Sequence, residues 1–138
     1  MKFNKLGSLK LLGIGVVVLW GSGCAVGPVA APEAEVKARV EASWQARLAG
    51  KFEDAYKYAA PSYRQEVSFD QYRSSFGGAT RWVAADIISI ACESQKCLVK
   101  MSISVPSPVP QQFSGNISTR IDESWIFEEN QWWVVPKR

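Results

Sequence analysis

Histidine is absent from this sequence of 138 residues, and cysteine occurs only three times. Without histidine, the chain lacks the general base of a Ser-His-Asp triad and a principal ligand of zinc sites. The cysteines, Cys24, Cys92 and Cys97, form no C-x-x-C pair. These absences argue against triad hydrolases and bound metals, and we expect neither a metal site nor a cofactor.

An excess of one charge is also missing from most of the chain. The formal charge of +3 comes from 16 basic and 13 acidic side chains. Lys2, Lys5 and Lys10 supply three of the basic residues, so the rest of the chain holds 13 of each sign. Proteins that bind nucleic acid carry a basic patch or stripe. We therefore expect no nucleic-acid partner.

No apolar run is long enough to span a bilayer as a helix, which takes about 20 residues. The run at 11–20, LLGIGVVVLW, follows the lysine-bearing start MKFNKLGSLK and precedes the small residues GSG. A positive flank, a short apolar core and small residues at its end are typical of an export signal. The sequence predicts a signal peptide over residues 1–23.

The residues at the end of this signal, Gly21-Ser22-Gly23-Cys24, resemble the lipobox of bacterial lipoproteins. The resemblance implies that Cys24 becomes the first mature residue and carries acyl chains such as palmitate. Ala25 follows, with no aspartate there, and the sorting rule of Gram-negative lipoproteins then implies the outer membrane, facing the periplasm. The alternative is ordinary signal cleavage at the same bond, which leaves Cys24 as a free thiol.

The other two cysteines form a natural pair once Cys24 is acylated. Cys92 and Cys97 enclose the four residues ESQK, between two strand-like segments. Because exported proteins fold in oxidising compartments, the sequence predicts a disulfide that closes a β-hairpin. The alternative is two reduced thiols.

The mature chain divides into a short tether and one domain. Residues 24–32 are small and proline-containing, and predict a flexible tether; residues 33–138 are of single-domain size. A helix is predicted from residue 33 to Gly50, on an apolar stripe that recurs every four residues: Val36, Val40, Trp44 and Leu48. A second helix, over 51–60, is predicted to end at Pro61. A third begins at Ser68, where Gln71 completes a capping box.

From residue 81 the apolar period changes from about 3.6 to about 2, which indicates strands. The predicted strands are 81–92, 96–105, 118–129 and 131–136. A proline-rich connection over 106–116 is excluded from the sheet interior. A tight turn is predicted at Glu129-Asn130. Helices followed by antiparallel strands indicate an α+β fold.

Two stretches resemble the NTF2-like domains. LAGKFEDAYKYAAPSYR (48–64) resembles their helical opening, and WIFEENQWWV (125–134) resembles their closing strands. The resemblance implies an α+β cone in which three N-terminal helices pack on a curved antiparallel sheet of about four strands. That superfamily includes isomerases, dehydratases, transport factors and binding-only domains, so the fold does not determine the function.

Acidic residues are predicted on apolar faces of the sheet. If Cys92 and Cys97 face each other, the register places Asp86 opposite Ile103, on the helix-covered face. Glu123 shares a strand face with apolar neighbours. Either acid, in such surroundings, could serve as a general base; the alternative is an acid at a wet rim or paired with an arginine such as Arg64 or Arg73. The candidate pocket residues are Asp86, Glu123, Tyr56, Tyr72, Trp82 and Trp125.

Adjacent tryptophans in the last strand point to opposite faces of the sheet. One of Trp132 and Trp133 must leave the core unless another segment covers it. An exposed tryptophan is a plausible docking point for a partner chain or a membrane interface. The alternative is packing against a loop or the tether.

Together these features predict a membrane-anchored exported lipoprotein that acts as a non-catalytic binding or accessory module of the cell envelope. Its expected partners are the membrane, through the N-terminal lipid, and an envelope protein or a small apolar ligand. The alternative is an isomerase or dehydratase that uses an acid in the pocket. The sequence leaves the choice between binding and catalysis open.

Overall fold

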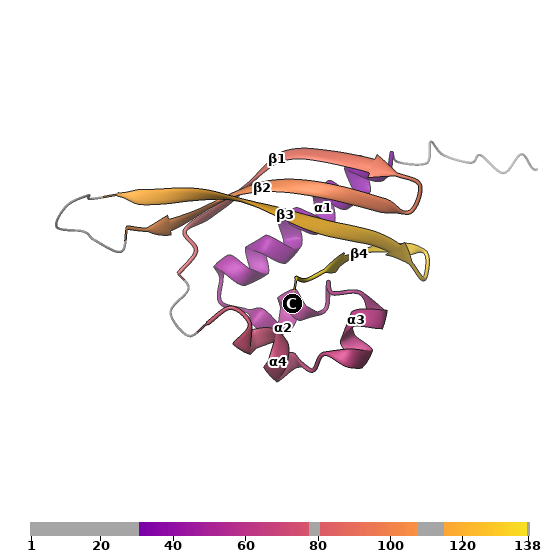
Figure 1. Cartoon of the computed structure of the whole chain (residues 1–138), viewed down its shortest axis with the longest axis horizontal. Coiled ribbons are helices and arrows are strands. Elements are labelled where there is room, and N and C mark those ends of the chain that lie inside the picture. The colour runs from indigo at the N-terminus through magenta and orange to yellow at the C-terminus, as the bar shows by residue number, and fades with distance from the viewer. Residues whose placement is uncertain (1–30, 78–80, 108–114, 138) are drawn as a thin grey trace, which may run out of the picture.

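The computed structural model describes residues 31–77, 81–107 and 115–137. Four helices precede four strands (Figure 1). The helices are α1 (Pro32–Leu48), α2 (Phe52–Tyr56), α3 (Pro61–Glu66) and α4 (Phe69–Ser74). The strands are β1 (Ala84–Glu93), β2 (Lys96–Pro106), β3 (Asn116–Glu128) and β4 (Gln131–Val135). The predicted signal peptide, Cys24 and all of the tether up to residue 30 lie outside the described residues.

The prediction of three helices is wrong. Only α1, with 17 residues, is a long helix, and α2, α3 and α4 have five, six and six residues. The additional helix arises at Pro61, which was expected to end a helix and instead begins α3. Proline suits the first turn of a helix because its fixed φ is helical and its missing N–H would have no partner there.

The start of α4 agrees with the predicted capping box. The Ser68 hydroxyl accepts a hydrogen bond from the Gln71 amide at 3.3 Å, and the Gln71 side chain accepts one from the Ser68 amide at 2.8 Å. Both interactions satisfy amide groups that a helix leaves unpaired at its N-terminus. This prediction is confirmed.

The strands form one antiparallel sheet in the order β1-β2-β3-β4. Strands β2 and β3 are paired along their length, whereas β4 pairs only with the last part of β3, from Ser124 to Glu128. The outer edge of β4 is covered by residues 58–60, since Val134 donates to the Tyr58 carbonyl and accepts from the Ala60 amide. The neighbouring edge of β3 before Ser124 pairs with no strand in the described ranges.

A β-bulge in β1 overturns the predicted register of that strand. Cys92 faces Cys97 and Ile90 faces Val99 as expected, but the register shifts between Ile87 and Ser89. Asp86 therefore faces Ser102 rather than Ile103. Because side chains alternate between faces, one extra residue moves every earlier side chain to the other face.

Two apolar clusters lie on opposite sides of β4. The larger joins α1 to the sheet and includes Val36, Val40, Trp44, Met101, Trp125 and Trp132. The smaller lies among the short helices and includes Ala59, Ala60, Tyr63 and Tyr72. In Figure 1, α1 runs behind the sheet and the short helices gather below β4. The end of α1 thus lies where both layers meet.

Candidate functional site

The C-terminal end of α1 carries a charged residue on its buried face. Arg47 lies about three turns after Val36, so both share the face toward the sheet. Leu48, which the four-residue spacing placed on this face, lies about 120° from Val36 around the axis and is 37% exposed. The predicted stripe is therefore wrong at its last member, and Arg47 takes that place.

Arg47 forms a buried ion pair with Glu123 of β3. Its Nη1 lies 2.6 Å from Glu123 Oε1, and the two side chains are only 4% and 8% exposed. The second carboxylate oxygen of Glu123 accepts a hydrogen bond from Trp125 Nε1 at 3.3 Å. Glu123 thus faces the core as predicted, but its partner is neither Arg64 nor Arg73.

The two charges of this pair stabilise each other. Burial lowers the pKa of the Arg47 guanidinium, but the negative charge of Glu123 and the hydrogen bond to it raise that pKa by more, so the net shift is upward. Arg47 is therefore a permanent cation. A carboxylate held by a buried guanidinium is a poor general base, because protonating it would leave the cation unpaired.

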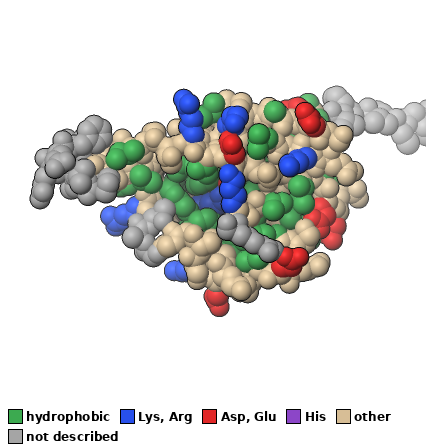
Figure 2. Space-filling model, in the orientation of Figure 1, with side chains coloured by type: hydrophobic (Ala, Val, Ile, Leu, Met, Phe, Trp, Pro, Cys, Tyr) green, Lys and Arg blue, Asp and Glu red, His purple; other side chains and the backbone are tan. Residues whose placement is uncertain are grey.

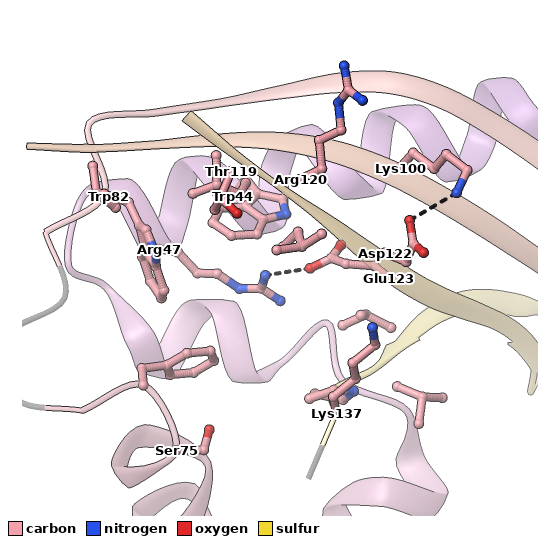
Figure 3. Close-up of a pocket in the computed structure, with 17 residues that line it drawn as sticks. Trp44, Arg47, Ser75, Trp82, Lys100, Thr119, Arg120, Asp122, Glu123 and Lys137 are labelled. Carbon is pink, nitrogen blue, oxygen red and sulfur yellow. Dashed lines mark hydrogen bonds and ion pairs between the residues drawn. The ribbon is translucent and has the colours of Figure 1, made fainter. Parts of the chain in front are cut away.

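The pair forms part of the wall of a cavity of 620 Å³. Its apolar walls include Trp44, Phe76, Trp82, Ile103, Ile121 and Val134. Its charged lining residues are Arg47, Lys100, Arg120, Asp122, Glu123 and Lys137. Figure 2 shows hydrophobic side chains gathered across the middle of this face, with basic side chains among them. Figure 3 shows how these residues surround the ion pair.

Cavities of this volume typically enclose a small molecule, with apolar walls and a few polar groups that orient it. The cavity lies beside the part of β3 before Ser124, where β4 no longer pairs with it. The shortness of β4 is therefore what leaves room next to Glu123. The residues after Trp133, from Val134 to Lys137, line the opposite side.

Aromatic rings form one end of the cavity. Trp82 makes edge contacts with Trp44, at 5.4 Å between ring centroids, and with Phe76 at 5.3 Å. These geometries are favourable for aromatic pairs. Trp82, predicted as a pocket residue, lines the cavity, and Trp44 and Phe76 were not predicted for it. Trp125, also predicted, is fully buried in the core and does not line the cavity, although it donates a hydrogen bond to Glu123, which does.

The two predicted tyrosines do not line the cavity. The Tyr56 hydroxyl donates to the Val67 carbonyl, and Tyr56 packs against Tyr72 in the cluster among the short helices. Tyr72 is fully buried, and its hydroxyl lies beside the Arg47 guanidinium. Burial raises the pKa of Tyr72, against the opposing effect of the Arg47 charge. Tyr72 is therefore a protonated phenol behind the Arg47 end of the pocket.

Asp86 is separate from this site. It is exposed, and it faces Ser102 after the bulge in β1. The expectation of two acids in one apolar pocket is wrong, because the bulge places Asp86 on the polar face while Glu123 stays on the core face. Arg47 is the residue that sequence reasoning missed. The 3.6-residue period of α1, followed strictly, would have found it.

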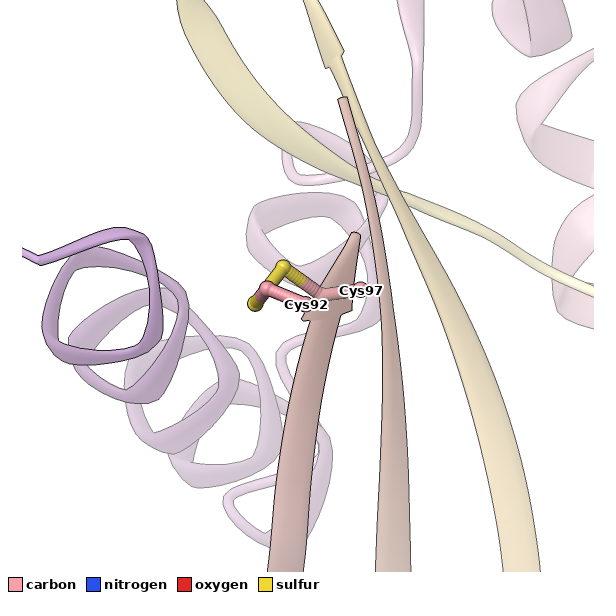
Figure 4. Close-up of a disulfide and its surroundings, with 2 residues drawn as sticks. All are labelled: Cys92 and Cys97. Carbon is pink, nitrogen blue, oxygen red and sulfur yellow. A yellow bond between two sulfur atoms is a disulfide. The ribbon is translucent and has the colours of Figure 1, made fainter. Parts of the chain in front are cut away.

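The predicted disulfide is confirmed. Cys92 and Cys97 are bonded, with an S–S distance of 2.01 Å, and Cys97 is fully buried. Figure 4 shows the bridge on the side of the hairpin that faces α1. The disulfide lies in the cluster between α1 and the sheet, remote from the cavity lining.

The paired tryptophans of β4 both find cover. Trp132 is 4% exposed in the cluster under the sheet. Trp133 points to the other side, where its Nε1 donates to the Glu128 carbonyl at 2.8 Å and the guanidinium groups of Arg39 and Arg64 lie over its ring. Trp133 is therefore only partly exposed, and among the described residues its cover includes Arg39 of α1 and Arg64 of α3.

The described residues contain neither a metal-binding cluster nor a membrane-spanning helix. Within the described ranges, no three Cys, Asp or Glu side chains gather in a way that would hold a metal ion. None of the helices described here combines the length and hydropathy that crossing a bilayer requires. The lipobox-like segment lies outside these ranges, so the anchor at Cys24 stays a prediction.

Comparison with known proteins finds a similarity in fold, without a match in sequence. The chain matches no protein family. It matches no curated protein. It is similar to the solution structure of a SEC-C motif containing protein from Rhodopseudomonas palustris, with a TM-score of 0.58, 10% identity and coverage of 75% of this chain and 77% of that chain. At this identity the likeness concerns the fold alone.

This likeness corrects the expected fold class. The sequence resemblance pointed to an NTF2-like cone with three N-terminal helices, whereas the similar structure is a SEC-C motif containing protein and this chain has four helices. The resemblance depended on the order and size of elements, which different folds share. The NTF2-like assignment is therefore withdrawn.

Proposed function

We propose that this chain is an exported, lipid-anchored module of the cell envelope that binds a small, largely apolar ligand without transforming it. The observation that carries the proposal is the 620 Å³ cavity, whose apolar walls surround an acid already paired with Arg47. A ligand gains most from such a site by burying apolar surface, at about 25 cal/mol per Å².

The location rests on three features of the chain. The segment before Cys24 resembles a lipoprotein signal, Ala25 follows it, and the Cys92–Cys97 disulfide suits an oxidising compartment. The lipid at Cys24 would hold the domain on the outer membrane, facing the periplasm. An envelope protein that delivers or receives the ligand is the expected partner.

The competing function is an isomerase or dehydratase that uses a cavity acid. Glu123 is the acid that lines the cavity wall on the core face, and both of its oxygens already accept hydrogen bonds. The other acid in the lining, Asp122, is paired with Lys100 at 3.3 Å. Because the acid on the core face is held in a buried ion pair and the other acid is about half exposed, the described lining of the cavity presents no desolvated, unpaired carboxylate, and binding is the better supported function.

The anchor is tested by the mass of the full chain extracted from membranes. We expect a chain that begins at Cys24 and carries acyl chains, and a Cys24→Ser variant that leaves the membrane fraction. An N-terminal methionine, or an unmodified thiol at Cys24, would overturn the anchored part of the proposal. The binding part would then be judged by the cavity experiment alone.

The cavity is tested by filling it. Val105 lines it, and Val105→Phe should weaken the binding of octanol, followed by tryptophan fluorescence, at least about fivefold. Leu98→Phe is the matched control, since Leu98 lies on the same strand, is 39% exposed and does not line the cavity. Octanol that fails to bind the native chain, or binds both variants equally, would refute the proposed binding site.

A further inference from the structure

The cavity wall carries buried hydrogen-bond donors that have no acceptor. Trp44 Nε1 and Arg47 Nε are both buried, and neither has a hydrogen-bond partner among the described residues. The two residues are 4% and 5% exposed, and both line the cavity. Each of these nitrogens can only donate. A buried donor without an acceptor costs about 1 to 3 kcal/mol, and the unpaired N–H dipoles of these two side chains leave the wall beside the ion pair electropositive.

The charges of the lining also favour an acceptor that is negative. Arg47 is neutralised by Glu123, and Lys100 by Asp122. Arg120 and Lys137 form no ion pair with any residue that the structure describes. The lining therefore has two cations more than it has acids. A ligand with one negative group would meet a favourable potential.

The two unpaired cations are not equivalent. In Figure 3 the Arg120 side chain points away from the ion pair, whereas Lys137 extends from the end of β4 toward Arg47 and Glu123. Lys137 is exposed, so its ammonium can stay hydrated until a ligand arrives. Lys137 is thus the cation of this lining that a ligand can meet directly.

The geometry points to a single carboxylate group on the ligand, held by Lys137 in front of the electropositive wall that Trp44 and Arg47 form. We infer that the ligand is an amphipathic monocarboxylate, with its apolar body against Trp82, Phe76 and Ile103. This inference rests on the proposed binding function and specifies its ligand class. A planar carboxylate suits the site because it offers acceptor lone pairs on two oxygens.

The test compares probes of equal chain length and different head groups. The full-length protein in lipid nanodiscs is titrated with octanoate, octanol and octylamine, with empty nanodiscs as the reference. We expect octanoate to bind at least about tenfold more tightly than octanol, and octylamine to bind most weakly. Raising the salt concentration should narrow the difference, because Lys137 is exposed.

Variants then assign the selectivity to residues. Lys137→Gln should weaken octanoate about fivefold and leave octanol unchanged. Lys96→Gln, an exposed lysine at the far end of β2, is the matched control and should change neither. Trp44→Phe keeps the aromatic wall but removes the indole N–H, so it should also reduce the preference for octanoate. Lys137 is exposed, so its variant reports on binding rather than on folding.

The outcomes separate the two proposals. If octanol and octanoate bind equally and Lys137→Gln changes neither, the binding function stands and the carboxylate inference is wrong. If no probe binds, the binding function itself fails. If Lys96→Gln abolishes the preference for octanoate as strongly as Lys137→Gln does, the carboxylate does not bind at Lys137. That result would also overturn the inference.

Discussion

Arg47 and Glu123 are 76 positions apart in the chain, and their side chains meet at 2.6 Å inside the protein. One comes from the last turn of α1 and the other from the middle of β3. Their contact ties the helix to the sheet and forms the polar part of an otherwise apolar cavity wall.

Breaking one side of the pair should be costly. Glu123→Gln leaves the buried Arg47 cation without its counter-charge, and should lower the free energy of unfolding by about 3 to 5 kcal/mol. Denaturant unfolding measures the change. Asp122→Asn is the control on the adjacent position, since its pair with Lys100 is about half exposed and should contribute less than about 1 kcal/mol. Replacing both partners, Arg47→Met with Glu123→Leu, should recover most of the lost free energy of unfolding. If Glu123→Gln and Asp122→Asn lower that free energy equally, burial does not set the strength of the pair.

Tyr72 should make the protein less stable in alkali. Burial raises the pKa of its phenol, so the folded state keeps the proton to higher pH than the unfolded chain, which ionises near pH 10. The unfolded state then binds fewer protons, and the free energy of unfolding falls as the pH rises above about 10. Tyr72→Phe should make this fall shallower, and should lower the free energy of unfolding at pH 7 by about 1 kcal/mol because it removes the hydroxyl beside Arg47. Thermal unfolding between pH 8 and 11 measures this dependence. If the free energy of unfolding falls equally steeply with pH in the native protein and in Tyr72→Phe, the raised pKa of Tyr72 is not the cause.

The disulfide should contribute a modest stability. It links residues only five positions apart, and closing so short a loop is worth about 2 kcal/mol in the chain-entropy account. Cys92→Ala with Cys97→Ala should lose about that amount, with a further loss because Cys97 is fully buried. The measurement is urea unfolding with and without reductant. Reductant should lower the free energy of unfolding of the native protein toward that of the variant, and should not change the variant. If reductant leaves the native protein unchanged, the disulfide adds no stability.

The capping box of α4 offers a local test. Ser68→Ala removes the hydroxyl that accepts from the Gln71 amide, and should cost about 1 kcal/mol. Ser74→Ala is the control, since its hydroxyl donates only to the Asp70 carbonyl within the same helix, a bond that adds little stability. Because α4 carries Tyr72, the loss should appear in the global unfolding transition. Equal effects of both substitutions would contradict the capping role.

Features that depend on near neighbours in the chain were open to prediction. The cap at Ser68, the hairpin disulfide and the turn at Glu129 and Asn130, both with positive φ, each depend on residues a few positions apart. Such short-range geometry follows from residue type and spacing alone. The core position of Glu123 could also be predicted from the alternation of side chains along β3, because that strand has no bulge that would move Glu123 to the other face.

The rest depended on where segments meet in space. The bulge in β1 turned Asp86 outward, Pro61 began a helix where a stop was expected, and the short β4 left a cavity beside β3. Arg47 has no neighbour in the sequence that predicts its partner, because an ion pair across 76 positions is decided by how α1 lies on the sheet. Local propensity determined most elements of this protein, and packing between layers determined which charges, donors and apolar walls share one site.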